Sequence, residues 1–532
     1  MPRIELQSFP MLLAMLMILL AGCARPDTSP VVEIDSGKLK GAVVADVTVF
    51  KGIPFAAPPV GEWRWRPPQP VEAWAGIRSA ENYAPFCAQP QSELLWFELD
   101  VINEDCLALN VWTPRLDENQ RLPVMVWIHG GGYSQGSGNI PRLNSPALVK
   151  EGVVLVTINY RLAFFGFLVH PALQASHPDD PYGNYGLMDA VAALEWVGNN
   201  IAAFGGDPDN VTIFGESAGA GIVNTLMVMP SAGGLFHRAI SQSSSVGLAL
   251  NPYPDRRAGF QQPAEKAGQA FVEQLGLTDN EDIAAALRAL STGDLLAAMG
   301  ERDRFTPIVD GVLLPEQPAR AYDLGHQHKV PYLTGGVSWE ASLGRSIGGG
   351  FSPERSAMLV GKADKERLYP GLAGVELEDT IFGDLVVLSA SRHVARGMHG
   401  IGAPIYSYYF SYVADARRGK RPGAAHTDDI AFVMQTLDTE KDLDPITPRD
   451  QKISKLISAY WVQFAKTGNP NKDGLPEWPL FDPDTARVLE IGDEVIARDN
   501  FIVDRLAFHR KRALDMLARA ESGSTPTKRM AQ

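Results

Sequence analysis

One stretch of the sequence decides the fold: Val211-Thr212-Ile213-Phe214, then Gly215-Glu216-Ser217-Ala218-Gly219, then a small and apolar run from Ala220 to Met227. The first four residues are β-branched or aromatic and predict a strand, and the last run predicts a helix. A G-x-S-x-G motif between a strand and a helix is typical of a nucleophile elbow, the sharp turn that presents a reactive serine. The flanking glycines permit such a turn because they lack a Cβ. The alternative is an ordinary small-residue turn.

Neighbouring patterns indicate an α/β fold. Strands are expected at 122–128 and 153–159, and a helix at 189–200 precedes the elbow strand. Strands that alternate with helices predict a large, mostly parallel sheet with helical crossovers, and residues 31–55 predict an antiparallel β region before it. Further predictions are helices at 263–299 and 453–467, strands at 333–337 and 405–410, and a mobile glycine-rich loop at 342–352.

Composition excludes some classes of function. The 532 residues are 45% hydrophobic, which is enough for a large core, and the net charge is -14. A negative surface argues against binding to nucleic acid and against attraction to anionic lipids. Neither Cys-x-x-Cys nor His-Glu-x-x-His spacing occurs, so no metal site is expected.

The N-terminus predicts export. Pro2-Arg3 is followed by an apolar run from Met11 to Ala21, which is too short to span a bilayer. The run ends in Leu20-Ala21-Gly22-Cys23, which resembles a bacterial lipobox. We therefore expect a signal peptide at 1–22, a lipidated tether at 23–30, and a protein held at the periplasmic or outer-membrane face by its lipid alone. The alternative is ordinary secretion with cleavage elsewhere.

Cys87 and Cys106 are the other two cysteines. An exported chain meets an oxidising compartment, so a disulfide between them is expected, and two free buried thiols are the alternative.

A second glycine motif follows the strand at 122–128: His129-Gly130-Gly131-Gly132-Tyr133. Its backbone N–H groups can turn inward without a Cβ in the way. Those of Gly131 and Gly132, with that of Ala218, are candidates for an oxyanion hole. A plain glycine-rich turn is the alternative.

A reactive serine also needs a base and an acid. Among ten histidines, His426 is the candidate base, because it lies in a small-residue loop after the strand at 405–410. In α/β-hydrolases the acid lies between serine and histidine in the chain. Glu340 follows a predicted buried strand, but on local grounds Asp310 and Glu316 remain rivals. An ordinary histidine base would lose activity as the pH falls through about 6 to 7.

Several further stretches belong together: Phe50-Lys51-Gly52-Ile53-Pro54-Phe55-Ala56, Glu104-Asp105-Cys106-Leu107, Gly183-Asn184-Tyr185-Gly186-Leu187, Phe204-Gly205-Gly206-Asp207-Pro208, Trp461, Phe464, Gly468-Asn469-Pro470 and Trp478-Pro479. Together with the two glycine motifs, these stretches resemble those of the carboxylesterase/cholinesterase family, also called the type B carboxylesterases. The resemblance extends from about Val31 to about Phe508.

This resemblance implies an α/β-hydrolase fold in a single domain at 31–510, with loop and helix insertions over the site, followed by a helix end and disordered tail at 511–532. It implies Ser217 as nucleophile, Glu340 as acid and His426 as base, with Gly131, Gly132 and Ala218 as oxyanion donors and Cys87 joined to Cys106. The implied activity is hydrolysis of small-molecule carboxylic esters through an acyl-enzyme, without a cofactor.

Two residues are candidates for the substrate pocket. Trp96 lies within the Cys87–Cys106 loop, where cholinesterases carry a cation-binding tryptophan, although a wall or lid role is the alternative. Leu250 falls near the position at which cholinesterases carry an acyl-pocket tryptophan. Asp429 stands where members of the family usually have a glutamate. The alternative functions are a lipase acting on longer acyl chains and, more distantly, a non-catalytic adhesion or scaffold protein.

Overall fold

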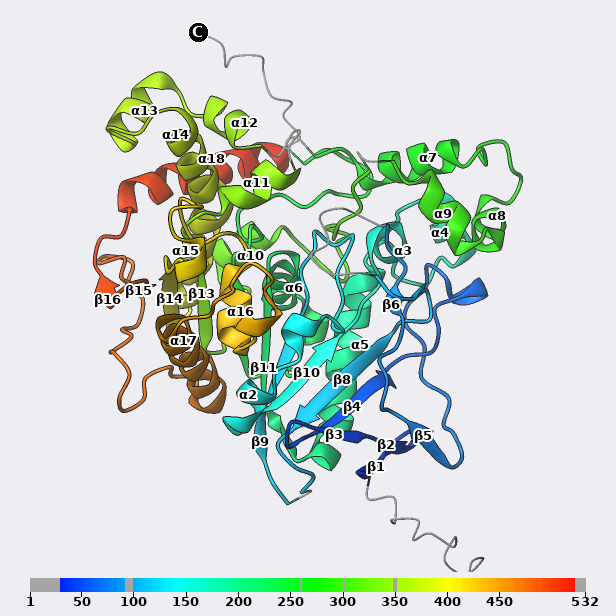
Figure 1. Cartoon of the computed structure of the whole chain (residues 1–532). Coiled ribbons are helices and arrows are strands. Elements are labelled where there is room, and N and C mark those ends of the chain that lie inside the picture. The colour runs from blue at the N-terminus through cyan, green and yellow to red at the C-terminus, as the bar shows by residue number, and fades with distance from the viewer. Residues whose placement is uncertain are drawn as a thin grey trace, which may run out of the picture.

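The computed structural model describes residues 29–90, 99–117, 119–258, 261–300, 303–347 and 352–521. Its centre is an eleven-stranded sheet (Figure 1). In spatial order the strands are β16 (Val495–Arg498), β15 (Val488–Ile491), β14 (Ile405–Phe410), β13 (Tyr332–Val337), β12 (Arg238–Gln242), β11 (Gly206–Glu216), β9 (Leu122–Ile128), β10 (Val154–Ile158), β8 (Ala108–Thr113), β4 (Val47–Pro54) and β3 (Ala42–Val44).

The middle of this sheet is parallel and its ends are antiparallel. All pairs from β10 through β9, β11, β12, β13 and β14 to β15 are parallel. The pairs β10–β8, β8–β4, β4–β3 and β15–β16 are antiparallel. The predicted parallel sheet with an antiparallel N-terminal region is therefore present. Two small sheets accompany it: β1 (Val31–Ile34), β2 (Gly37–Lys40) and β5 (Ile77–Ser79), and β6 (Phe86–Cys87) with β7 (Ile102–Asn103).

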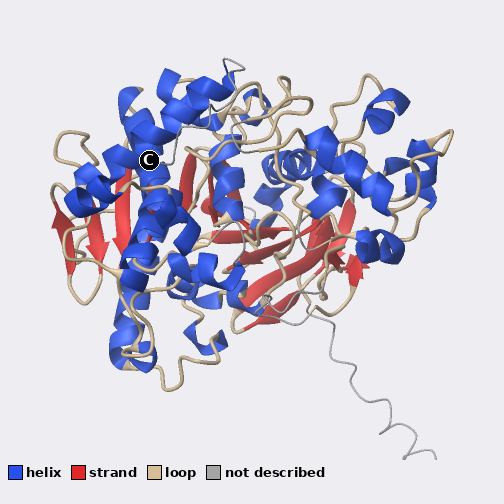
Figure 2. Ribbon diagram, turned by 90° about the horizontal axis from the view of Figure 1, so that it is seen from above, coloured by secondary structure: helices blue, strands red, loops and turns tan. Residues whose placement is uncertain are grey.

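Helices cover both faces of the sheet (Figure 2). Strand residues alternate between two cores: Val124 and Val126 of β9 belong to one hydrophobic cluster, and Met125 and Trp127 belong to the other. The first cluster includes residues of α5 (Tyr185–Asn200), α6 (Ala218–Leu226), α10 (Pro318–Leu324) and α15 (Ser389–Gly400). The second includes residues of α2 (Pro146–Lys150), α16 (Asp428–Met434) and α17 (Pro448–Thr467). Period-two burial on both faces explains why these strands are almost wholly apolar.

The remaining helices form two groups at the upper right and upper left of Figure 1. At the right are α3 (Ala163–Phe167), α4 (Pro171–Ser176), α7 (Ala264–Gln274), α8 (Ile283–Ala289) and α9 (Thr292–Ala298). At the left are α11 (Ala341–Ile347), α12 (Pro353–Met358), α13 (Lys362–Leu368), α14 (Gly374–Gly383) and α18 (Val503–Glu521), and a π-helical turn at Asp384–Leu388 joins α14 to α15. Of the helices in the described ranges, none combines the length and apolar character of a membrane span.

Some boundaries differ from those predicted; for example, the helix expected at 189–200 begins at Tyr185. The glycine-rich loop expected at 342–352 begins as helix α11, whose residues reach Ile347. Helix α17 starts five residues before the predicted position, because Thr447 and Asp450 form a reciprocal capping box ahead of Pro448. Helix α18 crosses residue 510 and reaches Glu521, in keeping with the helix end predicted after residue 510. The tail predicted beyond it lies outside the described residues.

Candidate active site

The elbow is formed by the end of β11, residue Ser217 and the start of α6. Ser217 has φ 56° and ψ −122°, a conformation that a non-glycine residue adopts only under constraint. The neighbouring glycines supply the constraint: a Cβ at Gly215 or Gly219 would lie 2.6 or 2.1 Å from the carbonyl oxygen of Ile128. The elbow therefore packs directly against the end of β9.

The loop after β9 lies against the same serine. A Cβ at Gly130 would be 3.2 Å from the Ser217 Cβ and 2.7 Å from the Glu216 carbonyl oxygen. Gly131 and Gly132 have φ values of +107° and +62°, which favour glycine. Within the described residues, the N–H groups of these two glycines and of Ala218 donate no hydrogen bond. Ala218 is the first residue of α6, so its N–H lies at the positive end of the dipole of that helix.

His129 orients this loop. Its Nδ1 lies 2.8 Å from the Gly130 carbonyl oxygen, and its ring stacks on Tyr160 with centroids 4.3 Å apart. The Tyr160 hydroxyl donates to the His129 carbonyl oxygen at 2.9 Å. Burial lowers the pKa of His129 to about 4, so its ring is neutral at neutral pH.

Glu340 and His426 meet in the buried part of the site. His426 Nδ1 lies 2.6 Å from Glu340 Oε2. The other carboxylate oxygen, Oε1, accepts from the Ser243 hydroxyl at 2.7 Å and from the Val337 N–H at 2.8 Å. A carboxylate at Nδ1 leaves Nε2 as the nitrogen that can exchange a proton with a nucleophile.

The loops that carry Glu340 and His426 are joined by their backbones. Trp339 and Ala425 form a parallel bridge, and the Trp339 N–H donates to the Ala424 carbonyl oxygen at 2.8 Å. The His426 N–H donates to the Ser342 hydroxyl oxygen at 2.8 Å. Glu340 and His426, 86 residues apart in the chain, are thus held together by hydrogen bonds between their loops.

Glu216 is a residue of the site that the sequence analysis missed. Its Oε1 lies 3.1 Å from His426 Nε2, at an angle outside that of a hydrogen bond, and neither atom has a hydrogen-bond partner in the described ranges. Burial opposes a charged imidazole, but Glu216 and Glu340 outweigh it and raise the pKa of His426 to about 9. Burial raises the pKa of Glu216 to about 8. These carboxylates therefore favour a pKa of His426 above the ordinary histidine value expected from the sequence.

Ser217 is brought next to this pair through Glu216, its neighbour in the chain. Among the described residues its hydroxyl has no hydrogen-bond partner. Catalytic hydrogen bonds are often long or misaligned in ligand-free enzymes and tighten when substrate binds.

Asp429, three residues after His426, belongs to a buried polar group beside the site. Its Oδ2 accepts from Gln242 Nε2 and from the Tyr408 hydroxyl, each at 2.9 Å. Gln242 in turn accepts from Trp461 Nε1 at 3.1 Å, which links this polar group to helix α17. Burial raises the pKa of Asp429 to about 6.

The rival acids do not join the site. Asp310 Oδ1 accepts the N–H groups of Val312 and Leu314 in its own turn. Glu316 pairs with His326 at 2.5 Å on the surface. Leu250 is half-buried and packs against the larger core cluster. Trp96 and Cys23 lie outside the described residues.

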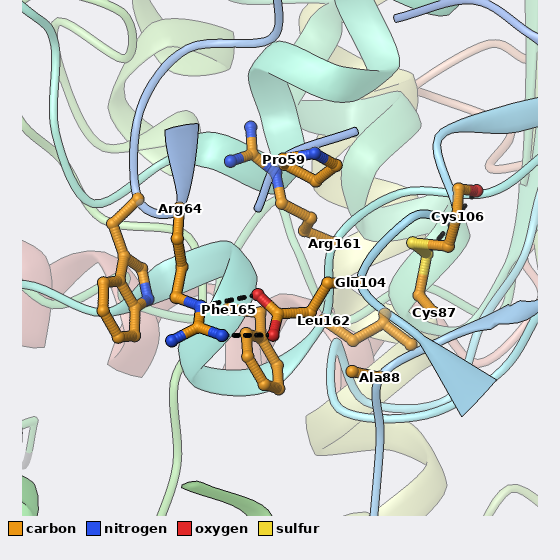
Figure 3. A pocket seen from close by; sticks show the side chains of 10 residues that line it. Pro59, Arg64, Cys87, Ala88, Glu104, Cys106, Arg161, Leu162 and Phe165 are labelled. Carbon is orange, nitrogen blue, oxygen red and sulfur yellow. Dashed lines mark hydrogen bonds and ion pairs between the residues drawn. A yellow bond between two sulfur atoms is a disulfide. The ribbon is translucent and has the colours of Figure 1, made fainter. Parts of the chain in front are cut away.

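Cys87 and Cys106 form a disulfide beside a small cavity (Figure 3). Arg64 and Glu104 line this cavity and pair through two hydrogen bonds of 2.7 and 2.6 Å. Arg64 also donates to the Leu290 carbonyl oxygen at 2.8 Å, just beyond α8. No residue of the proposed triad lines this cavity, so it is a structural junction between the disulfide loop and the α8–α9 region.

No group of three or more His, Cys, Asp or Glu side chains in the described ranges is arranged to bind a metal ion.

Comparison with known proteins identifies the family. A family model described as "Carboxylesterase family" matches residues 28–355 and 375–508. The chain belongs to this family. It is 35% identical to a fumonisin B1 esterase of Sphingopyxis macrogoltabida over 497 residues, covering 88% of this chain and 87% of the relative. It is 34% identical to the para-nitrobenzyl esterase of Bacillus subtilis (strain 168) over 500 residues, covering 88% of this chain and 96% of the relative.

A solved structure gives the same result. The crystal structure of a Geobacillus stearothermophilus carboxylesterase superposes with a TM-score of 0.75 at 32% identity, covering 90% of this chain and 99% of that one. The predicted family, the α/β-hydrolase fold and hydrolysis of carboxylic esters are thereby confirmed. The adhesion or scaffold alternative is correspondingly set aside.

Proposed function

We propose that this carboxylesterase cleaves esters with Ser217 as nucleophile, His426 as general base and acid, and Glu340 as the orienting acid. The observation that carries the proposal is the 2.6 Å contact between His426 Nδ1 and Glu340 Oε2, beside the strained elbow at Ser217.

The steps follow from the roles of the groups. His426 Nε2 takes the proton of the Ser217 hydroxyl as its oxygen attacks the ester carbonyl. The imidazolium then gives that proton to the departing alcohol, which leaves an acyl-enzyme. A water molecule then attacks the acyl-enzyme while His426 removes its proton. The carboxylic acid product and free Ser217 are released. Glu340 fixes the tautomer and stabilises the imidazolium in both halves.

The negative oxygen of each tetrahedral intermediate is held by the N–H groups of Gly131, Gly132 and Ala218. Their lack of other acceptors in the described ranges supports this role. Loss of one such donor typically costs about 3 kcal/mol in transition-state free energy.

The test is covalent labelling of the serine. A fluorophosphonate should modify Ser217, as located by peptide mass spectrometry, and Ser217→Ala should remain unlabelled and lose hydrolysis of p-nitrophenyl acetate. Ser245→Ala, which changes a half-buried serine that serves no role in the mechanism, is the control and should keep both activities. An active, labelled Ser217→Ala would exclude the assignment.

We also propose that the chain is an exported lipoprotein acylated at Cys23. The support is the Leu20-Ala21-Gly22-Cys23 sequence and the Cys87–Cys106 disulfide, which suits an oxidising compartment. Metabolic labelling with a palmitate analogue should mark the wild type and not Cys23→Ser. Label retained in Cys23→Ser contradicts the proposal.

We propose that the substrates are small-molecule esters. We also propose that Leu250 and Trp96 contribute to the substrate pocket. A lipase is the second candidate, favoured by exposed apolar side chains on the helices that follow Glu340: Ile347, Met358 and Val375. Rates on p-nitrophenyl esters from acetate to palmitate separate the two, because a carboxylesterase loses activity on the long chains and a lipase gains it.

A further inference from the structure

A partly buried ion-pair network contacts the turn that carries His426. We call it the arginine–carboxylate network; its members are Arg142, Arg417, Arg421, Asp428, Glu440 and Asp442. Three guanidinium groups face three carboxylates, so the network has no net charge when all are ionised. None of these residues has a part in the mechanism described above.

Asp428 connects the network to the turn. Its Oδ2 accepts the N–H of Ala425, the residue before His426, at 2.9 Å. Its Oδ1 accepts from Arg417 at 2.8 Å and from Arg421 at 3.3 Å. One carboxylate thereby ties the backbone beside the base to two arginines.

The turn itself is strained. Thr427, directly after His426, has a φ of +77°, a conformation that a β-branched residue adopts only where its surroundings enforce it. Arg142 reaches the Thr427 hydroxyl at 3.4 Å and pairs with Glu440, which pairs with Arg417 at 3.1 Å. The network thus contacts the strained turn at two residues, Ala425 and Thr427.

The network is shielded from solvent where it meets the turn. The Arg417 side chain is 5% exposed and that of Asp428 is 10% exposed. Arg418, the next residue, also makes ion pairs, with Asp415 and Asp493, but its side chain is 36% exposed and it does not contact the turn. Breaking a buried pair leaves an uncompensated charge, whereas breaking an exposed pair changes little.

We propose that Asp428 is a positioning residue for the base: with Arg417 it holds the strained turn so that the His426 imidazole stays aligned with Ser217. This inference rests on the proposed function. Asp428 touches no reacting atom and acts only through the turn at 425–427. Misplacement of a catalytic group by about 1 Å can cost about 100-fold in rate, so a loosened turn should lower kcat.

The experiment compares two substitutions at this position on a soluble p-nitrophenyl ester. Asp428→Ala removes both the ion pair and the acceptor for the Ala425 N–H, and should lower kcat by about 10- to 100-fold with KM changed less than twofold. Asp428→Asn keeps an oxygen acceptor and removes the charge, so its kcat should lie between that of the wild type and that of Asp428→Ala. The rate of fluorophosphonate labelling should fall in parallel, since it reports the alignment of base and nucleophile.

Arg418→Gln is the matched control, because it removes ion pairs of the same kind on the exposed side; its kcat should stay within twofold of wild type. Thermal unfolding shows that each variant is folded at the assay temperature. Asp428→Ala with a lowered melting temperature and unchanged kcat overturns the proposal, since that is the signature of a merely structural residue. If Asp428→Ala does not fold, a wild-type kcat in Asp428→Asn overturns it instead.

The outcomes separate this inference from the proposed function. An active Ser217→Ala would remove the triad whatever happens at Asp428. An inactive Ser217→Ala together with a fully active Asp428→Ala would leave the triad in place and remove only the positioning role.

Discussion

The two halves of the active site are held in place in different ways. Ser217, the proposed nucleophile, lies on a short local motif with a strained backbone, and the glycines on either side pack closely against β9. Glu340 and His426, the proposed acid and base, come from loops 86 residues apart, and hydrogen bonds and ion pairs hold them together. The elbow, whose backbone is fixed by steric contacts, should tolerate few substitutions. The hydrogen-bonded side chains around His426 can instead be changed one at a time with graded effects.

The largest effect in this comparison is expected from removing the carboxylate that we propose orients His426. Glu340→Gln keeps the size of the side chain, but the amide cannot stabilise the imidazolium and can hold the wrong tautomer. We expect kcat to fall by about 10⁴-fold. Steady-state kinetics with p-nitrophenyl acetate gives the value. Glu316→Gln, at the rejected rival acid, is the control, and a Glu340→Gln enzyme within tenfold of wild type would contradict the assigned role.

On the other side of the comparison, Gly130→Ala should disturb the elbow. The new Cβ would lie 2.7 Å from the Glu216 carbonyl oxygen and 3.2 Å from the Ser217 Cβ, so backbone must move. We expect a loss of about 100-fold in kcat, because the oxyanion loop and the serine are pushed apart. Gly198→Ala in α5, where a Cβ meets nothing within 4 Å, serves as control. Unchanged kcat in Gly130→Ala speaks against steric fixation of the elbow.

Glu216→Gln sharpens the comparison because it changes charge rather than shape. His426 must be neutral to act as base, so activity is lost as the pH falls through its pKa. Glu216 contributes to raising that pKa to about 9, and its neutralisation should move the midpoint of the acidic limb downward by about one pH unit. The pH dependence of kcat/KM measures this, with the exposed Glu195→Gln as control. A midpoint that stays or rises is inconsistent with the contact.

The smallest catalytic effect is expected at the disulfide. Replacing both Cys87 and Cys106 by serine should lower the free energy of unfolding by about 3 kcal/mol, because the unfolded chain regains the freedom of that loop. The value of kcat should change less than twofold, since the disulfide lies outside the hydrogen-bonded site. Urea unfolding without reductant and steady-state kinetics give the two numbers. A large fall in kcat with unchanged stability would mean that the disulfide loop shapes the site.

Local patterns predicted the central fold well. The strand at 122–128 has its predicted bounds, and so does the strand at 405–410, because both are apolar runs that end at glycine or polar residues. Helix α11 was mistaken for loop: its glycine-rich surroundings predict a turn, and its helical state depends on packing against α14 and on Glu340 before it. Tertiary contacts of that kind leave no periodic signal in so short a segment.

The site was predictable in the same uneven way. Ser217 and the Gly130–Gly132 loop follow from motifs whose chemistry is local. Glu340 was separated from its rivals only by family resemblance, because carboxylates at turns look alike until their partners are known. The contact between Glu216 and His426 could not be predicted from the sequence, because it joins the side chains of two residues 210 positions apart.

Helix α11 begins at the residue after Glu340, and its second residue, Ser342, accepts the His426 N–H. The first turn of the helix group at the upper left of Figure 1 is therefore also part of the catalytic scaffold. For protein engineering this means that changes at the start of this helix group are expected to alter turnover. Mutant libraries of this enzyme should therefore keep residues 338–342 constant, because changes there would disturb the hydrogen bonds that hold the His426 loop.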